Sequence, residues 1–344
     1  MRFGYSDDCL AHDTGLRHPE TADRLRAIRE GLTRRHGVEY VAASPADRET
    51  ITAVHDADYV DEVAAFADGG GGNWDPDTVV SEETFAAACR SAGLAEWAVR
   101  ESLTGEIGRD TPFSIGRPPG HHAVGDDAMG FCFFNNAAVA VQAVLDDPTT
   151  DAERAAVFDW DVHHGNGTQD LFYDAGDVFY ASVHEDGIYP GTGAVTETGE
   201  ADGAGTTLNA PLAAGADDGD YRYVVEEAVV PALSAFEPDL VVVSAGFDAH
   251  RHDPISRMRL STEGYAVLAD RMRSLARRHD AGLAFVLEGG YDLDTLSDGV
   301  GVVHETFDGR PVTPGDEEPT AATRDTVREL RDRLDLDDAD EPPE

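Results

Sequence analysis

The sequence predicts an α/β protein in which a central, mostly parallel β-sheet is flanked by helices. Short apolar runs of strand length alternate with longer segments of helical periodicity, the pattern of a parallel sheet covered on both faces. Hydrophobic residues make up 41% of the 344 residues, enough for a sizeable core. Polar clusters follow five of the apolar runs, as expected where ligands bind at the carboxyl ends of parallel strands.

Five runs rich in apolar residues are predicted to be buried strands. In chain order they are residues 112–115, 155–158, 178–183, 240–244 and 283–287. Helices are predicted around and between them, at residues 82–101, 136–145, 221–236 and 262–278. Ser261 or Thr262 is the candidate cap of the last of these helices.

Two regions are expected along the chain. Residues 1–308 are predicted to form the main domain, which contains all of the polar clusters described below and is therefore the expected catalytic domain. After Gly309 the composition shifts towards Pro, Asp and Glu, which predicts an acidic C-terminal extension over residues 309–344. Within it, residues 323–336 have the pattern of an acidic helix, and residues 337–344 are expected to be disordered.

The charge of the chain is extreme. Its 68 acidic residues face 26 basic ones, all of them arginine, for a net charge of −42. Such a charge either attracts basic partners or keeps a protein soluble in concentrated salt. Because the acidic residues are spread along the whole chain, we favour salt adaptation and expect a halophilic source. The charge argues against nucleic-acid binding, which needs a basic surface.

Cysteine usage and hydropathy restrict the function further. Cys9, Cys89 and Cys132 are odd in number and lack C-x-x-C spacing, so neither a disulfide framework nor a cysteine zinc site is expected. The chain begins without an apolar signal segment, and no apolar run is long enough to span a membrane. We therefore expect a cytoplasmic protein with no membrane partner. The sequence leaves the oligomeric state open.

Metal-ligating side chains are concentrated where a predicted strand ends, in the stretch V-F-D-W-D-V-H-H-G-N-G-T-Q that begins at Val157. If this stretch is extended, Asp159, Asp161 and His163 share one side of it. A strand-end turn explains the glycines, but not this grouping of carboxylates and imidazole. Asp161 and His163 therefore predict a cation site, with Asp248 of A-G-F-D-A-H as the leading third ligand. Three protein ligands leave a coordination position for water.

Other polar residues supply rival ligands and candidate catalytic groups. His250 and His252 are rival ligands or, with more weight, surface histidines. His121 and His122 follow Pro118-Pro119-Gly120 and are candidate bases, against the alternative of one packed and one exposed histidine. A base needs a partner that selects its tautomer, and the candidates are Asp159 and Asn166. Tyr291 is a candidate donor to an oxyanion, against the alternative of a buried structural tyrosine.

Together, these motifs resemble the signatures of the histone deacetylase superfamily. The resemblance rests on R-P-P-G-H-H-A, G-F-C-F-F-N-N, D-W-D-V-H-H-G-N-G-T-Q, A-G-F-D-A-H and L-E-G-G-Y-D, and it spans about Arg2 to Thr306. It implies an arginase/deacetylase-like three-layer fold. Asn166, where class I members usually carry aspartate, and Glu288 before G-G-Y favour the class II branch, which places the chain near the prokaryotic acetoin-utilisation-type proteins.

The resemblance also implies roles for the candidate residues. One Zn²⁺ per chain would be held by Asp161, His163 and Asp248. His122 would act as general base and acid, oriented by Asn166, with His121 as its electrostatic partner held by Asp159. Tyr291 would polarise the acetyl carbonyl.

Substrate contacts and a second ion follow from the same resemblance. Gly130 and Phe131 would line the acyl tunnel, and Tyr189, where many members carry phenylalanine, would form the opposite wall. Arg24 resembles the arginine of the acetate-exit channel, and the alternative is an arginine on a helix surface. A structural K⁺ is implied near Asp159, Asp161, His163, Ser182 and Val183.

The sequence is therefore interpreted as a zinc-dependent amidohydrolase that deacetylates an amine, with acetyl-lysine in proteins as the first choice of substrate. The alternatives are an amidohydrolase acting on acetylpolyamines or another small molecule, a non-catalytic acetyl-lysine binder, and a two-metal ureohydrolase. Polyamine deacetylases of the superfamily can carry a glutamate just after the D-P that follows the third metal ligand. Ile255 occupies that position here, which favours acetyl-lysine.

Overall fold

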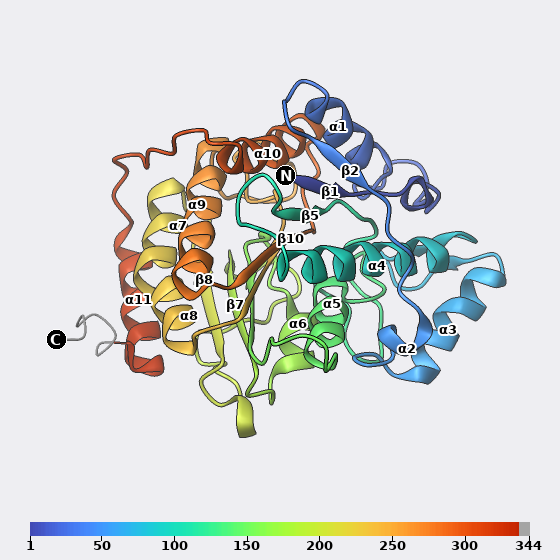
Figure 1. Ribbon diagram of the computed structural model, residues 1–344, viewed down its shortest axis with the longest axis horizontal. Coiled ribbons are helices and arrows are strands. Elements are labelled where there is room, and N and C mark those ends of the chain that lie inside the picture. Colours follow the sequence, from blue (N-terminus) through green and yellow to red (C-terminus); the bar gives the residue numbers. More distant parts are fainter. Residues whose placement is uncertain (337–344) are drawn as a thin grey trace.

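The computed structural model describes residues 1–336, and within them an eight-stranded sheet forms the centre of the molecule (Figure 1). The strand order is β2-β1-β5-β10-β9-β6-β7-β8, and every neighbouring pair is parallel. The strands are β1 (Arg2–Gly4), β2 (Glu39–Val41), β5 (Pro112–Ser114), β6 (Ala155–Asp159), β7 (Val178–Glu185), β8 (Thr207–Leu212), β9 (Leu240–Ala245) and β10 (Gly282–Leu287). The short strands β3 (Gly72–Asn73) and β4 (Val79–Val80) form a separate antiparallel pair.

All five predicted strands are present, as β5, β6, β7, β9 and β10. The sequence analysis missed β1, β2 and β8. Strands β1 and β2 have three residues each, too few to show an alternating pattern. Strand β8 contains Asn209 and Pro211, residues that disfavour a central strand but are tolerated at a sheet edge.

The four helices predicted around and between the strands are present, and five further α-helices within residues 1–336 were not predicted. In chain order, the helices are α1 (Asp23–Leu32), α2 (Arg48–Ile51), α3 (Ala57–Asp68), α4 (Thr84–Ser102), α5 (Asn136–Leu145), α6 (Asn166–Phe172), α7 (Asp218–Val224), α8 (Val230–Phe236), α9 (Thr262–His279), α10 (Leu293–Phe307) and α11 (Ala321–Leu334). The predicted helix at 221–236 is α7 and α8 joined by a π-helical turn. Ser261, not Thr262, caps α9, because its hydroxyl accepts the Gly264 N–H at 3.0 Å.

Helices cover both faces of the sheet, which confirms the three-layer α/β fold. The alternation of side chains along β6 shows how the layers form. Ala156 and Phe158 pack into a core with residues of α1, α7, α9 and α10, whereas Ala155 and Val157 pack with residues of α4 and α5 on the opposite face. Both faces are apolar because a parallel sheet is buried on both sides.

The C-terminal helix α11 lies where the helix was predicted at residues 323–336, but its predicted acidic character is wrong, because four arginines face three acidic residues within it. It packs beside β8 and α7, and its Val327 and Leu330 belong to the same core as the central strands. The predicted disorder of residues 337–344 lies outside the described residues. The division of the chain at residue 308 stays a prediction.

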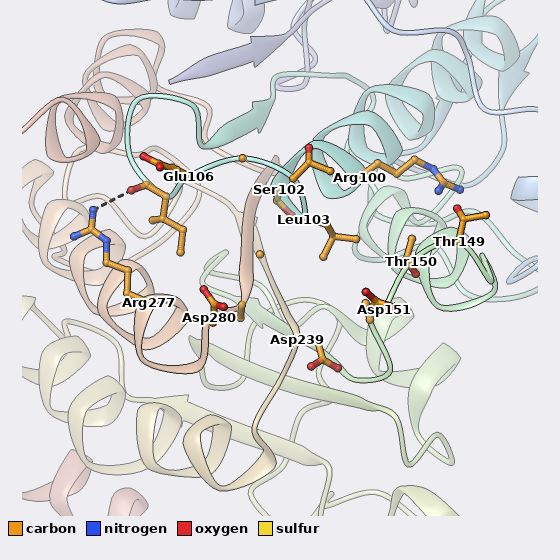
Figure 2. Close-up of a pocket in the computed structure, with 16 residues that line it drawn as sticks. Arg100, Ser102, Leu103, Glu106, Thr149, Thr150, Asp151, Asp239, Arg277 and Asp280 are labelled. Carbon is orange, nitrogen blue, oxygen red and sulfur yellow. Dashed lines mark hydrogen bonds between the residues drawn. The ribbon is translucent and has the colours of Figure 1, made fainter.

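The two ends of the parallel strands differ. Where the strands begin, a cavity of about 880 Å³ lies near the starts of β9 and β10 and the end of α4 (Figure 2). Arg277 borders it and donates to the Ile107 carbonyl at 2.9 Å, and none of the predicted site residues lines it. The predicted clusters instead follow the carboxyl ends of the strands. None of the described helices is both long and apolar enough to cross a membrane.

Candidate active site

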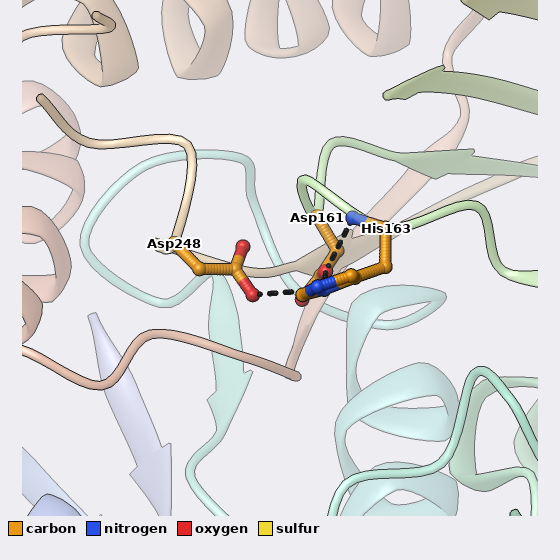
Figure 3. A group of neighbouring side chains, drawn as sticks. All are labelled: Asp161, His163 and Asp248. Atoms are coloured by element: carbon orange, nitrogen blue, oxygen red, sulfur yellow. Dashed lines mark hydrogen bonds and ion pairs between the residues drawn. The ribbon is translucent and has the colours of Figure 1, made fainter. Parts of the chain in front are cut away.

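Three side chains from neighbouring strand ends meet at the carboxyl edge of the sheet (Figure 3). Asp161 and His163 follow β6, and Asp248 follows β9, which pairs with β6. The Nδ1 atom of His163 lies 3.1 Å from Asp161 Oδ1 and 3.4 Å from Asp248 Oδ2. Within residues 1–336, this is the one group of three or more possible ligand side chains whose ligand atoms all lie within 4.8 Å of one another.

Local backbone turns bring Asp161 and His163 together. Strand β6 ends at Asp159, whose Oδ1 accepts the Asp161 N–H at 3.0 Å. Asp161 Oδ1 in turn accepts the His163 N–H at 2.9 Å. The expected extended conformation is therefore wrong beyond Asp159, because these carboxylates bond to the backbone two residues ahead and turn the chain.

The three side chains fit a divalent metal. The buried Oδ2 atom of Asp248 accepts no hydrogen bond within the described residues, a costly state unless a cation binds it. Burial and the nearby charge of Asp161 raise the pKa of Asp248 to about 7, and a cation between the carboxylates would relieve that repulsion. A Cβ atom on Gly289 would lie 2.2 Å from Asp248 Oδ2, so only glycine lets the chain approach this closely. Two carboxylates and an imidazole suit zinc or a similar transition metal.

The paired histidines after β5 lie next to this group, each with its own partner. His121 Nδ1 is 3.0 Å from Asp159 Oδ2, and His122 Nδ1 is 2.8 Å from Asn166 Oδ1. The two imidazole rings lie 4.0 Å apart between centroids, and the ring of His163 is 5.9 Å from that of His122. Both histidines are buried, so the alternative of one exposed histidine is wrong.

The two imidazoles differ in charge. Burial disfavours the charged form of His121, but the carboxylates of Asp161 and Asp159 outweigh burial and raise its pKa to about 10. Burial lowers the pKa of His122 well below its ordinary value, and the charges of His121 and His163 lower it further. A neutral imidazole thus lies beside a charged one. Because Asn166 accepts the Nδ1–H of His122, the Nε2 atom carries the free lone pair.

Tyr291 reaches the same edge from the loop after β10. Its ring lies under the guanidinium of Arg24, 5.0 Å from the ring centroid. Burial raises the pKa of Tyr291 well above 10, against the lowering effect of Arg24, so its phenol keeps the proton needed to donate a hydrogen bond. Arg24 is 0% exposed and bonds to the Gly290 carbonyl at 2.8 Å and to Glu20 at 3.2 Å. The alternative of a surface arginine is therefore wrong.

Two aromatic rings flank these polar groups. Phe131 contacts Tyr291 with ring centroids 5.9 Å apart, and Tyr189 contacts His122 at 5.1 Å. Tyr189 is 39% exposed. Gly130 has φ +55°, and a Cβ there would lie 2.5 Å from the His122 ring, so glycine is required beside this imidazole.

The sequence analysis gave no catalytic role to two buried carboxylates that hold the site. Glu288 Oε2 accepts the Gly120 N–H at 2.7 Å and the His121 N–H at 3.2 Å, which fixes the backbone of the histidine pair. Asp253 Oδ2 accepts the Tyr291 N–H at 2.7 Å. An acidic residue within an apolar run, as in L-E-G-G, was the available signal for Glu288, because such a group is rarely buried without partners.

The rival ligands do not join the metal group. His250 is buried rather than on the surface, and its Nε2 contacts the Thr262 hydroxyl at 3.3 Å. His252 is exposed. Within residues 1–336, neither histidine belongs to a cluster of metal-ligating side chains.

Comparisons with known proteins agree with this geometry. The model of the histone deacetylase domain matches residues 18–307. A histone deacetylase-like amidohydrolase of Pseudomonas aeruginosa is 42% identical over 277 residues, covering 79% of this chain and 71% of that protein. A probable deacetylase of Archaeoglobus fulgidus is 36% identical over 296 residues, covering 84% of this chain and 81% of that protein. The crystal structure of the HDA15 HD domain superimposes with a TM-score of 0.88 at 33% identity, covering 98% of this chain and 96% of that one.

Proposed function

Because this chain belongs to the histone deacetylase family, a family of metal-dependent hydrolytic enzymes, we propose that it is a zinc-dependent deacetylase of acetyl-lysine in proteins. One observation carries the proposal. The buried group of Asp161, His163 and Asp248 lies beside a neutral imidazole, His122, whose Nδ1 is already bonded to Asn166. A metal site next to an oriented base suits amide hydrolysis.

The proposed metal ligands are Asp161, His163 and Asp248. When bound there, Zn²⁺ supplies a Lewis acid and lowers the pKa of a nearby water. Two carboxylates offset the charge of the ion, so the chain must supply a separate base for the attacking water.

The proposal also includes a structural K⁺, which would lie near Asp159, Asp161, His163, Ser182 and Val183. It is supported by the pairing of Asp159 with Ser182 across β6 and β7.

His122 is the proposed general base and acid. Its Nε2 accepts a proton from the attacking water and returns it to the nitrogen of the departing lysine amine. His121, held by Asp159 at 3.0 Å, keeps a positive charge beside it. That charge favours the developing oxyanion and keeps His122 neutral until it takes the proton.

Tyr291 is the proposed donor to the oxyanion. Its phenol keeps its proton, and Arg24 and Asp253 hold its ring and backbone. A positioned donor strengthens its bond as charge develops on the carbonyl oxygen.

The proposed contacts of the acyl chain are Gly130, Phe131 and Tyr189. Arg24 donates to two backbone carbonyls after β10. Its proposed role, carried over from the family resemblance, is to line the channel through which acetate leaves.

The alternative substrate is an acetylpolyamine or another small acylated amine. Ile255, half-buried after Asp253-Pro254, offers no carboxylate to a distant ammonium group, which supports acetyl-lysine. A non-catalytic binder would have no use for a candidate base, His122, together with a candidate oxyanion donor, Tyr291. The ureohydrolase alternative needs two sets of metal ligands. Within residues 1–336 there is a single set, Asp161, His163 and Asp248.

A deacetylation assay tests the proposal. Purified enzyme is loaded with Zn²⁺ and given acetyl-lysine peptides, acetylspermidine and acetylputrescine in both low and molar salt, since an acidic surface favours salt. We expect the peptides to have the highest kcat/KM. Hydrolysis of the acetylpolyamines alone would contradict the proposed substrate, and hydrolysis of neither class would contradict the proposed activity.

A further inference from the structure

We infer that a cluster of arginines beside the site binds an acidic side chain of the acylated substrate, near its acetyl-lysine. The arginine pocket, as we call it, has a volume of about 480 Å³, and the residues that line it include Gly215, Arg251, His252, Ser256, Arg257 and Arg259. The inference rests on the proposed peptide substrate and adds a second recognition point to it.

The charges in the arginine pocket are unusual for this chain. Acidic residues outnumber the 26 arginines by more than two to one, and nearly every arginine side chain forms an ion pair or a hydrogen bond. Within residues 1–336, the three arginines whose side chains have no such partner are Arg17, Arg251 and Arg259. Two of these three face the same pocket. Unpaired guanidinium groups that gather in a strongly acidic protein indicate a ligand of negative charge.

The pocket is tied to the catalytic residues. The Ser256 hydroxyl donates to the Asp248 carbonyl at 2.6 Å, so the loop from Arg251 to Arg259 is fastened to a proposed metal ligand. In the same loop, Asp253 Oδ2 accepts the Tyr291 N–H at 2.7 Å. A ligand in the arginine pocket therefore lies at the same edge of the sheet as the reacting amide.

Backbone hydrogen bonds hold the segments of chain that carry Arg251 and Arg259. The Arg251 N–H donates to the Leu260 carbonyl at 2.9 Å, and the Arg259 N–H donates to the Ala216 carbonyl at 2.8 Å. Arg257 pairs with the buried Glu185 at the end of β7, with its Nε 2.5 Å from Oε1. Glu185 offsets the charge of Arg257, so Arg251 and Arg259 supply the net positive charge. A preorganised loop loses little entropy when it binds a ligand.

The chemistry of the pocket selects a carboxylate. Guanidinium groups bind carboxylates through two parallel hydrogen bonds, and a second positive charge nearby strengthens the attraction. The loop that carries the arginines is fastened to Asp248 and Tyr291, and an extended peptide advances about 3.3–3.6 Å per residue. The proposed ligand is therefore a glutamate or aspartate a few residues from the acetyl-lysine. The same charges repel the ammonium groups of a polyamine.

The test uses a series of acetyl-lysine peptides. Each carries glutamate, glutamine or lysine at one position within three residues of the acetyl-lysine, and kcat and KM are measured at low and high salt. With the wild-type enzyme, we expect glutamate to raise kcat/KM over glutamine by about 3- to 10-fold at one or more positions, as for a single well-placed ion pair. The gain should appear in KM, because the pocket contacts a part of the substrate that does not react. It should shrink as salt screens the charges.

Substitutions connect the preference to the pocket. Arg251→Gln/Arg259→Gln should abolish the preference for glutamate but leave kcat for the glutamine peptide unchanged. The charge reversal Arg251→Glu/Arg259→Glu should favour the lysine peptide. The matched control is Arg34→Gln/Arg328→Gln, which removes two exposed arginines far from the pocket in sequence. Arg34 lies in the turn after α1 and pairs with Glu30, and Arg328 lies in α11 and pairs with Asp325. This control should keep the preference. Thermal melts confirm that each variant folds.

Each outcome decides the inference. Equal kcat/KM for the glutamate and glutamine peptides at every position overturns it while leaving the proposed function intact, as does a preference that survives Arg251→Gln/Arg259→Gln. If no peptide is hydrolysed, the proposed function fails instead. Fluorescence anisotropy with the labelled glutamate and glutamine peptides then measures binding alone, and an equal Kd overturns the inference.

Discussion

His122 and Asn166 are joined by a hydrogen bond of 2.8 Å between Nδ1 of the imidazole and Oδ1 of the amide. The Nδ2 group of Asn166 donates to the His122 carbonyl at 3.3 Å, so the amide oxygen faces the ring. The imidazole is therefore the Nδ1–H tautomer, with its Nε2 lone pair free. Asn166 stands at the first turn of α6, which holds the amide in this position.

The first prediction concerns this bond. Asn166→Ala removes the acceptor, so the ring of His122 loses its fixed orientation and tautomer. We expect kcat to fall by about 10- to 100-fold, with the zinc content unchanged. Asn166→Asp is the matched control, because a carboxylate accepts the same hydrogen bond. Steady-state kinetics and elemental analysis check both variants, and an alanine variant as fast as the wild type would remove the orienting role of Asn166.

The second prediction separates chemistry from metal binding. His122→Ala and Tyr291→Phe should each lower kcat by about 100-fold or more, as expected for lost acid–base or oxyanion assistance. Neither residue belongs to the metal group, so both variants should retain the metal. Single-turnover rates measured alongside elemental analysis distinguish a catalytic loss from metal loss. A near-normal rate in either variant would contradict its assigned role.

The third prediction is one tightly bound divalent metal per chain. Asp161, His163 and Asp248 form the one suitable group within residues 1–336. Because there is one such group, elemental analysis of protein purified without chelators should give about one equivalent of transition metal per chain. Chelation should abolish hydrolysis, and added Zn²⁺ should restore it. Two tightly held transition metals per chain would revive the ureohydrolase alternative.

The fourth prediction is a loss of stability in mild acid that depends on His55. Its Nδ1–H donates to the Val124 carbonyl at 2.9 Å, and its Nε2 accepts the Asn135 N–H at 2.9 Å. Burial lowers its pKa from 6.5 to about 4. As pH falls from 6.5 to 4, the unfolded chain therefore binds a proton that the folded protein does not bind. The free energy of unfolding should fall by up to about 1.4 kcal/mol per pH unit for this group.

The variant His55→Gln isolates this contribution. Glutamine can still accept the Asn135 N–H but does not titrate. The difference in free energy of unfolding between wild type and variant should stay constant above pH 6.5 and shrink as pH falls towards 4. Chemical denaturation at a series of pH values measures it. A difference that is independent of pH over this range would mean that His55 is not held neutral.

The fifth prediction concerns Ile255. A carboxylate there would attract the distant ammonium of a polyamine by about 4 kcal/mol at roughly 4 Å, before desolvation and salt reduce it. We expect the wild type to prefer acetyl-lysine peptides over acetylspermidine in kcat/KM, and Ile255→Glu to narrow or reverse that gap. Ile255→Gln, of similar size but uncharged, is the control. A wild-type preference for acetylspermidine would contradict the proposed substrate.

Much of the site could be predicted from the sequence, because its chemistry is encoded in local motifs. Asp161 and His163 are two residues apart, and His121 and His122 are adjacent, so their grouping does not depend on the fold. Alternating strands and helices predict a parallel sheet, and the carboxyl ends of such strands share one edge. This rule alone brings Asp248 and Tyr291 to the same place, as observed.

The tertiary structure alone decided the contacts between distant segments. Arg24 was compatible with a surface helix, and its burial depends on Glu20 and on the carbonyls after β10. Glu288 supports His121 across 167 positions of sequence. Burial, and the partner that each charge finds, depend on how helices pack over the sheet. No local pattern encodes that packing, because hydrophobic burial has no direction and many residues share each contact.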